Sequence, residues 1–505
     1  MSSEKEPRNN ETVLVVDDQD STESLSKAQA SRLLLKTDLV VMPLAILSMT
    51  LAFLDKNALG YAAVFGLRED NNLVGQQYSW LSSIFYFGYL AMEFPNLWLM
   101  TKLPIGKYVG VCLVLWGASL CFMASCHNFA GLATIRFLLG VFEAALLPCM
   151  MIVNSMWYRK EEQPLRTAFW YNTFAERLLT GIQYIFIIYG AVTVLAGGLV
   201  FFALPDSPSK AWFFNETEKK LALVRLAENQ TGIDSHKVSL SPRAVASSLF
   251  WKKALHAVEE PLTNAPPQTF SAKQILETLR DPKCYCIWAC AFGYAIANAG
   301  VTNFNPLIIA GYGFSRTKTV LMATPQAAVA MVSGAILTAI TFWVPNVRCI
   351  FWIFSSLVGM AGAVMVHSLD AATQRNASLA GVYLMGFYNV PWVFMLSLSS
   401  SNTAGATKKS FMGISIAVVY AVGNIVGPQF YLQRQAPHYP LGIGSMLCAF
   451  ALMAFAGISY YFLCIAENKR RDSKYGKPQD DLQIGLEADR TDSTDLENHN
   501  FRYTY

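Results

Sequence analysis

The chain has 505 residues, of which 53% are apolar and only 15% are charged. Soluble proteins are about 25% charged, so this composition excludes a set of ordinary soluble domains and predicts an all-α membrane protein with many spans. The formal net charge of +4 is too small to indicate a nucleic-acid partner.

Both ends of the chain are polar. Residues 1–36 have no basic stretch followed by a short apolar core, so we expect no cleaved signal peptide, and the first span should act as its own signal anchor. Residues 467–505 are similarly polar. We expect both ends to be disordered and cytoplasmic.

Eleven apolar stretches are long enough to cross a bilayer, which needs about 20 residues of helix. A twelfth segment, 167–182, is doubtful, and the polar stretch 205–283 divides the spans into two groups. The eleven stretches are 39–57 or a little beyond, 78–101, 108–127, 129–157, 183–204, 284–310, 318–342, 347–368, 379–402, 409–432 and 441–465.

Lysine and arginine collect in alternate loops, which places both termini in the cytoplasm if the number of spans is even. The predicted inside loops hold Lys102, Lys107, Arg159, Lys160, Arg166, Lys408, Lys409, Lys469, Arg470, Arg471 and many residues of 205–283, against Arg68, Arg316, Lys318, Arg375 and Arg434 outside. Two six-helix bundles, 37–204 and 284–466, joined by a cytoplasmic loop, 205–283, are the plan of major facilitator transporters.

Two charges interrupt the fourth span. Arg136 and Glu143 are seven residues apart, so they lie on one face of a helix. A charge at mid-bilayer costs at least about 2.5 kcal/mol and normally faces the bundle interior or a water-filled cavity. The pair is therefore either a structural ion-pair network between helices or an anion site, Arg136, beside a proton carrier, Glu143.

Further charges lie in the first two spans. Asp55 and Lys56 point about 100° apart on a helix, so one can face a cavity while the other faces a neighbouring helix. Alternatively the first span ends there, although Gly60 and the small residues after it favour a continuing helix. Glu93 follows in the second span, shortly before Pro95. We predict that Lys56 binds substrate and that Glu93, Glu143 and Asp55 carry protons.

The second half has almost no charge in its spans and is instead rich in amides. Asn303, Asn389 and Asn424 are our candidates for substrate contact, while helix-to-helix contact explains such amides equally well. Further amides are Asn298, Asn305 and Gln429. Pro306, Pro391 and Pro428 each predict a kink or break, and broken helices beside amides are where transporters often hold a ligand.

No enzyme chemistry is indicated. The six histidines are scattered, and signatures of a Ser-His-Asp triad, a metal site or a phosphate loop are absent from the sequence. The ten cysteines lie in or beside apolar runs, which is typical of buried packing residues. Cys284 and Cys286 have no second pair and no nearby histidine, so we predict neither a metal nor a cofactor.

Many motifs in order resemble the fungal anion:cation symporters of the major facilitator superfamily, most closely the allantoate permease group. The resemblance covers about residues 36–471. The motifs include FLDKNALGYAAVFGL, QYSWLSSIFYFGYLAMEFP, NFAGLATIRFLLGVFEAALLPC, SMWYRKEEQPLR, LPDSP, ENQTGI, NFNPLIIAGYGFS, NTAGATKKS and YAVGNIVGPQF. RFLLGVFEAA is similar to the superfamily's fourth-helix motif, which implies a role for Arg136 in substrate or proton coupling.

The resemblance implies a monomeric, multi-pass plasma-membrane protein that takes up a small organic anion together with protons. Allantoate, ureidosuccinate and nicotinate are typical substrates of such proteins. Two alternatives remain open: a proton antiporter that exports a secondary metabolite, and a non-transporting or defective isoform.

The stretch NETEKKLALVRLAENQTG, from Asn215, fits a cytoplasmic helix, while LPIGKYVG is a degenerate form of the loop joining helices two and three.

The fifth span departs from this family. Thr167–Ile182 has 16 residues, about 24 Å as a helix, and is interrupted by Glu176 and Arg177. This is too short to cross the membrane and also turn back outside. Residues 238–273 also differ from the usual central loop. Both features fit either wrong exon boundaries or alternative splicing, or else a genuinely divergent protein with a short fifth helix. We expect a tilted, incomplete fifth helix that preserves the orientation of the second half.

Overall fold

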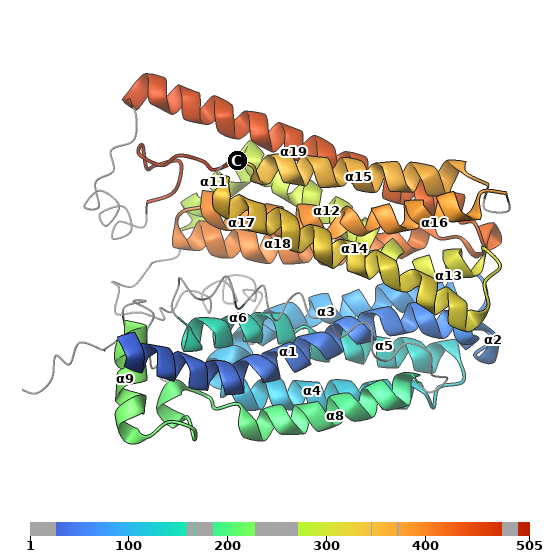
Figure 1. The fold of residues 1–505 in the computed structure, drawn as a ribbon, viewed down its shortest axis with the longest axis horizontal. Coiled ribbons are helices and arrows are strands. Elements are labelled where there is room, and N and C mark those ends of the chain that lie inside the picture. Colours follow the sequence, from blue (N-terminus) through green and yellow to red (C-terminus); the bar gives the residue numbers. More distant parts are fainter. Residues whose placement is uncertain are drawn as a thin grey trace, which may run out of the picture.

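A computed structural model describes residues 27–158, 166, 185–227, 271–344, 346–370, 373–476 and 493–505. These residues form two helical bundles that lie side by side (Figure 1), and none of the described residues forms a β-strand. One end of the molecule, which we call the tail end, carries α9 (Glu216–Ala227), α11 (Ala272–Arg280) and residues 493–505. The opposite end, the α2 end, carries α2 (Leu67–Asp70) and the loop 431–439.

Each of the eleven predicted spans falls on one helix or on consecutive helices. The N-terminal bundle contains α1 (Lys27–Phe65), α3 (Gln77–Lys102), α4 (Ile105–Met123), α5 (Phe129–Glu143), α6 (Leu146–Trp157) and α8 (Ile185–Ala203). The C-terminal bundle contains α12 (Pro282–Asn303), α13 (Asn305–Ala310), α14 (Arg316–Trp343), α15 (Arg348–Ser368), α16 (Arg375–Leu384), η4 (Met385–Tyr388), α17 (Asn389–Asn402), α18 (Ala406–Val426), η5 (Gly427–Phe430) and α19 (Pro440–Tyr475).

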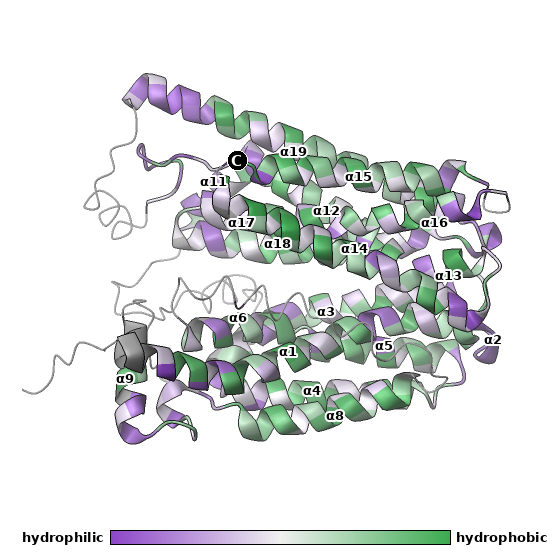
Figure 2. Cartoon of the chain, viewed as in Figure 1, coloured by the Kyte–Doolittle hydropathy of each residue, from purple (hydrophilic) through white to green (hydrophobic). Residues whose placement is uncertain are grey.

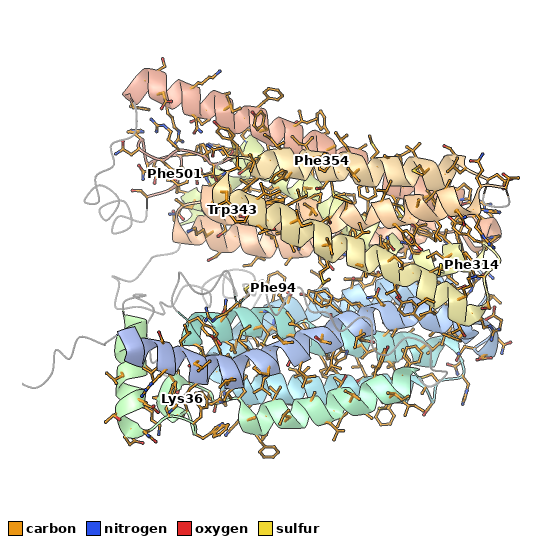
Figure 3. The ribbon with its side chains drawn as sticks, in the orientation of Figure 1. Lys36, Phe94, Phe314, Trp343, Phe354 and Phe501 are labelled. Atoms are coloured by element: carbon orange, nitrogen blue, oxygen red, sulfur yellow. The ribbon has the colours of Figure 1, made fainter. Side chains whose placement is uncertain are left out.

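Ten helical segments of the described residues are long and apolar enough to cross a membrane. Figure 2 shows apolar residues along the middle of the bundles and polar residues at their ends, on α9 and on the last turns of α19. Large apolar side chains on the C-terminal bundle, such as Trp343 and Phe354, are exposed (Figure 3). Outward-facing apolar side chains of this kind suit a lipid environment.

The predicted breaks at three prolines are confirmed. Pro306 is the second residue of α13, which begins just after α12 ends, and Pro428 lies in η5. Pro391 follows the 3₁₀ turn η4 at the start of α17. A proline lacks the N–H that would continue the helical hydrogen-bond ladder, so each long span is divided at this point.

The helices of the N-terminal bundle approach closely where glycines meet. A Cβ atom added to Gly140 on α5 would clash with the carbonyl oxygen of Phe85 on α3. A Cβ atom added to Gly88 on α3 would likewise clash with the carbonyl oxygen of Phe137. Small residues at a crossing allow backbones to approach, and this crossing holds α5, with Arg136 and Glu143, against α3.

The ends of α6 and α8 define the direction of the sixth span. Trp157 stacks on Phe213 at 5.7 Å between ring centroids, beyond the last residue of α8. At the opposite end, the thiol of Cys121 donates to the carbonyl of Ile187 at 3.7 Å, near the first residue of α8. The helix α8 therefore runs parallel to α5 and α6, as a sixth span should.

The predicted fifth span, Thr167–Ile182, and most of the unusual loop 238–273 lie outside the described residues. Arg166 pairs with Asp38 on α1 at 2.7 Å. The same part of α1 contacts α9 through the ion pair between Lys36 and Glu218 at 2.6 Å. Arg166 is therefore at the tail end, whereas Ile185 is at the α2 end, so the described residues on either side of this segment lie at opposite ends of the bundle.

Hydrogen bonds join the two bundles at the α2 end. The hydroxyl of Tyr78 on α3 donates to the carbonyl of Asn303 at 2.8 Å. Ser79 donates to the carbonyl of Tyr431 at 3.2 Å. One turn further along α3, Ser83 donates to the carbonyl of Ile425 at 2.7 Å. We call these three donors the α3 latch, because they hold the first turns of α3 against the C-terminal bundle.

The expectation of disordered ends at 1–36 and 467–505 is wrong for part of each. The helix α1 already begins at Lys27, and α19 continues to Tyr475. Residues 493–505 pack against the C-terminal bundle, where Asn402 donates to the carbonyl of Thr504 at 2.7 Å. Residues 1–26 and 477–492 lie outside the described residues.

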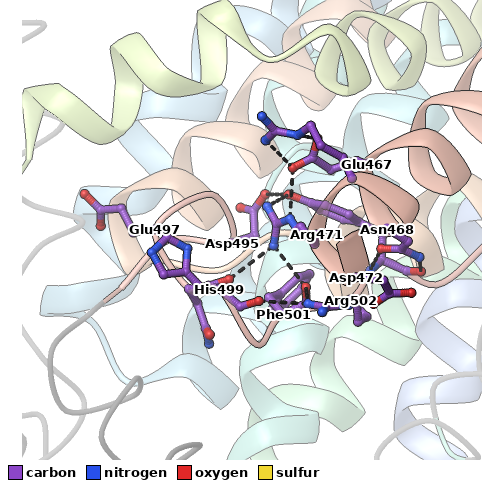
Figure 4. Close-up of polar contacts among 12 residues, drawn as sticks. Glu467, Asn468, Arg471, Asp472, Asp495, Glu497, His499, Phe501 and Arg502 are labelled. Carbon is purple, nitrogen blue, oxygen red and sulfur yellow. Dashed lines mark hydrogen bonds and ion pairs between the residues drawn. The ribbon is translucent and has the colours of Figure 1, made fainter. Parts of the chain in front are cut away.

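Charged contacts explain why such a polar tail docks. Lys408 lies 2.7 Å from Asp495, and both side chains are buried. Arg471 donates to the carbonyls of Asn498 and Phe501 and to the hydroxyl of Tyr503 (Figure 4). Polar composition alone predicted disorder, but here the polar groups of the tail find partners on α18 and α19.

Candidate functional site

A cavity of about 170 Å³ lies at the meeting of the two bundles. Its walls come from α1 on one side and from α12, α13, α14, η4, α17 and α18 on the other. The polar lining residues are Lys56, Asn57, Asn298, Thr302, Asn305, Thr324, Gln326 and Asn389, and the aromatic ones are Phe53, Tyr61, Tyr294, Tyr388 and Tyr420. Most of this wall therefore belongs to the amide-rich second half of the chain.

Lys56 is the only charged residue among the described residues that line the cavity. Its ammonium group lies 3.1 Å from the carboxylate of Glu143 on α5. The lysine side chain is 27% exposed, whereas the glutamate side chain is only 4% exposed. The cavity is thus connected, through one lysine, to an acid buried inside the N-terminal bundle.

Asp55 faces the other way. Its side chain is buried and accepts a hydrogen bond of 2.9 Å from the indole N–H of Trp116 on α4. The expectation that Asp55 and Lys56 face different surroundings is confirmed. The alternative that the first span ends at these residues is wrong, because α1 continues to Phe65.

Arg136 is buried inside the same bundle, with 4% of its surface exposed. It shares a face of α5 with Glu143, as their spacing predicted, and its charge interacts with that of Asp55. Its Nε and Nη2 atoms have no hydrogen-bond partner among the described residues. Arg136 does not line the cavity, so its predicted contact with substrate stays a prediction.

Two acids and two bases therefore meet inside the N-terminal bundle: Asp55, Lys56, Arg136 and Glu143. Their formal charges cancel, which is the arrangement that buried charges require in a medium of low dielectric constant.

Glu93 lies on α3, away from the cavity lining. Its Oε2 atom is buried and has no hydrogen-bond partner among the described residues.

The three asparagines chosen from the sequence have different surroundings. Asn389 lines the cavity and accepts a hydrogen bond of 3.2 Å from the hydroxyl of Tyr294. Asn424 accepts from Asn298 at 2.9 Å and so joins α18 to α12. Asn303 donates to the carbonyl of Ala299 on its own helix. Neither Asn303 nor Asn424 lines the cavity. Asn424 makes a helix-to-helix contact, and Asn303 makes a contact within its own helix.

Sequence reasoning missed two parts of the site. One is an aromatic cluster in which the ring of Tyr294 stacks on Trp392 at 4.5 Å and on Tyr388 at 5.5 Å. The other is Gln326, whose amide accepts a hydrogen bond of 2.7 Å from Asn305. A single amide in the apolar run of α14 was the available signal for Gln326. Aromatic residues are too common in membrane helices for their type alone to indicate a cavity.

Two helical bundles that surround a polar cavity and are joined by hydrogen bonds at one end define a secondary transporter. Residues 45–428 match the Major Facilitator Superfamily, and the chain belongs to this family. It is accordingly a transporter and not an enzyme.

Similar proteins agree with this assignment. An uncharacterised transporter of Schizosaccharomyces pombe is 32% identical over 95% of this chain and 93% of its own length. The allantoate permease of Saccharomyces cerevisiae is 29% identical over 93% of this chain and 85% of its own length. The resemblance to allantoate permease-like members is thus confirmed. The inward-open xylose transporter of E. coli has the same fold, with a TM-score of 0.57, 11% identity and coverage of 83% of this chain and 95% of its own.

Proposed function

We propose that the protein takes up a small organic anion, of the allantoate, ureidosuccinate or nicotinate kind, together with protons. The observation that carries this proposal is Lys56, a partly exposed cation in a cavity whose other described lining residues are uncharged. An anion that enters the cavity finds one attractive charge there. The allantoate permease among the similar proteins supports the same class of substrate.

The ion pair between Lys56 and Glu143 supplies a coupling step. While Glu143 is ionised, it neutralises Lys56 at 3.1 Å and weakens the attraction for an anion. A proton on Glu143 removes that competition, so a substrate carboxylate then meets an unpaired lysine. Proton and anion thereby favour each other's binding, which is the linkage that symport requires. Asp55 and Glu93 are the further candidates for the proton.

The distribution of the basic residues supports one orientation in the membrane. We propose that the tail end is cytoplasmic, with both termini on that side, because the predicted inside loops carry most of the lysines and arginines. The α3 latch then closes the extracellular end of the molecule in this conformation. The proposal places the protein in the plasma membrane as a monomer.

Uptake of labelled allantoate by cells that express the protein tests the function. The wild-type protein should accumulate label when the outside is acidic and lose accumulation when a protonophore is added. The Lys56→Ala variant should neither bind nor transport the anion under either condition. A competition panel of unlabelled anions then ranks the substrates. Proton-driven efflux of the label would indicate an exporter, and the absence of binding and of flux in either direction would indicate a non-transporting protein; both outcomes contradict the proposal.

A further inference from the structure

Two amide side chains of the C-terminal bundle form a buried pair at the wall of the cavity. Asn305 is the first residue of α13, after the break from α12, and Gln326 follows Pro325 inside α14. The Nδ2 atom of Asn305 donates to Oε1 of Gln326 at 2.7 Å. The two residues are 1% and 5% exposed, and both line the cavity.

This pair leaves one acceptor oxygen atom and one donor nitrogen atom unused. Oδ1 of Asn305 and Nε2 of Gln326 have no hydrogen-bond partner among the described residues. Exchanging the oxygen and nitrogen of both amides would keep the hydrogen bond between them and again leave one donor and one acceptor. Buried polar groups of this kind are destabilising unless a partner arrives. The position of the pair at the cavity wall makes a ligand the available partner.

We propose that Asn305 and Gln326 form a subsite that recognises a neutral group carrying both an N–H donor and a carbonyl acceptor, such as a carboxamide or ureido group, on the transported anion. The inference rests on the proposed function, in which Lys56 in the same cavity meets the carboxylate of that anion. The substrate N–H donates to the free amide oxygen, and the substrate carbonyl accepts from the free amide N–H.

The subsite discriminates by chemistry as well as by size. A hydrocarbon group of the same shape would leave the donor and the acceptor unpaired, and a second carboxylate would offer acceptors to both. Sites built to hydrogen-bond a substrate reject an analogue that lacks the group far more strongly than apolar pockets reject a missing methylene. The pair therefore selects anions with an amide-type group over purely hydrocarbon anions.

A matched pair of competitors tests this selection. N-carbamoylglycine and 4-methylpentanoate carry one carboxylate each and have the same number of non-hydrogen atoms, but only the first has a ureido group. Both compounds compete with labelled allantoate for uptake by the wild-type protein. The inhibitory concentration of N-carbamoylglycine should be at least about tenfold lower than that of 4-methylpentanoate. Gln326→Met and Asn305→Leu should bring the two inhibitory concentrations together. Ser333→Ala is the control and should keep the wild-type difference, because Ser333 lies on α14 outside the cavity lining and its hydroxyl donates to the carbonyl of Ala330 in its own helix.

A second measurement needs neither transport nor folded variants. N-carbamoylglycine should raise the melting temperature of the purified wild-type protein more than 4-methylpentanoate does at the same concentration. Equal effects of the two compounds, or a wild-type preference that survives in both variants, would overturn the subsite. A larger effect of N-carbamoylglycine without any anion uptake would support the subsite and contradict the proposed function, so the two failures are distinguishable.

Discussion

Lys56 on α1 is joined to Glu143 on α5 across 3.1 Å, yet of these two residues only the lysine lines the cavity. The ion pair thus has one partner that a substrate can meet and one that it cannot. Because Lys56 contacts both the cavity and Glu143, its ammonium group can exchange the Glu143 carboxylate for a substrate carboxylate. The alternatives first considered for this region, an ion-pair network and an anion site beside a proton carrier, are compatible in this arrangement.

Glu143→Gln should abolish proton-driven accumulation of allantoate and keep exchange of labelled for unlabelled substrate. Glutamine still accepts a hydrogen bond from Lys56, but its side chain cannot bind or release a proton in the transport cycle. Glu93→Gln and Asp55→Asn, measured in parallel, identify the carrier if Glu143 is not it. Normal accumulation by all three variants would place proton coupling elsewhere.

Lys56→Ala should reduce the amount of protein at the cell surface as well as uptake, because it leaves Glu143 without its counter-charge. Removing one partner of a buried ion pair costs about 3 kcal/mol or more. The double variant Lys56→Met with Glu143→Gln should restore surface protein, measured by biotinylation, without restoring uptake. Restored uptake would show that Lys56 only balances Glu143.

Arg136→Ala should abolish uptake while the protein stays at the cell surface, and Arg136→Lys should recover little, because lysine lacks the planar guanidinium group. The structure adds a control through Asp55, whose charge interacts with Arg136. If uptake returns in Arg136→Met with Asp55→Asn, the arginine acts by balancing Asp55. Normal uptake by Arg136→Ala alone would contradict any role in transport.

Ser83→Ala should favour conformations in which the α2 end is open. The Ser83 hydroxyl donates to the carbonyl of Ile425 and accepts from Nε2 of Gln429 at 2.9 Å. Losing hydrogen bonds worth about 1 kcal/mol each should shift the equilibrium about fivefold or more. Distances between spin labels at Arg68 and Arg434 measure the shift. Ser119→Ala, which removes a hydroxyl bonded within its own helix, should leave the distances unchanged.

Docking of residues 493–505 should weaken in acid. Lys273 donates to the carboxylate of Glu497 at 2.7 Å, and this hydrogen bond lowers the pKa of Glu497 below its usual value of about 4.3. A lowered pKa in the folded state gives stability that is present above the usual value and is lost as the pH falls through the lowered one. The protection of the amides of Asn498 to Tyr503 against hydrogen exchange, measured relative to the intrinsic exchange rate at each pH, should fall over that acidic range, and less so in Glu497→Gln. An equal pH response of the two proteins would contradict this role for Glu497.

Glycan mapping should find Asn215 and Asn229 unmodified. Asn215 is exposed at the tail end, which we propose to be cytoplasmic, whereas the sequon at Asn376 is exposed at the α2 end. Asn376 lies at the first turn of α16, so proximity to the membrane can limit its modification. A mobility shift upon deglycosylation that disappears in Asn215→Gln or Asn229→Gln would show that the orientation is inverted.

The spans were predictable from the sequence because a membrane helix needs a long apolar run, which leaves a visible pattern. The facing of Asp55 and Lys56 was predictable for a similar reason, since adjacent residues on a helix must point apart. Which asparagines line the cavity was not predictable. Asn389 and Asn424 are the same residue type in similar runs, and only the packing of α18 against α12 separates their roles. The docked tail also escaped prediction, because its partner Lys408 is distant in sequence and its partner Arg471 lies in the same polar stretch that was expected to be disordered.

The α3 latch has a consequence for how the two halves of the chain can diverge. Tyr78, Ser79 and Ser83 donate to backbone carbonyls of the C-terminal bundle, not to its side chains. A carbonyl is present at a position whatever its side chain, so point substitutions in the second half leave these acceptors in place. Mutations of α3 can therefore strengthen or weaken these three hydrogen bonds without a compensating mutation in the second half, whereas the hydrogen bond that Ser83 accepts from Gln429 depends on a second-half side chain. Substitutions in α3 can therefore change how readily the α2 end opens, while the cavity residues of the C-terminal bundle change independently.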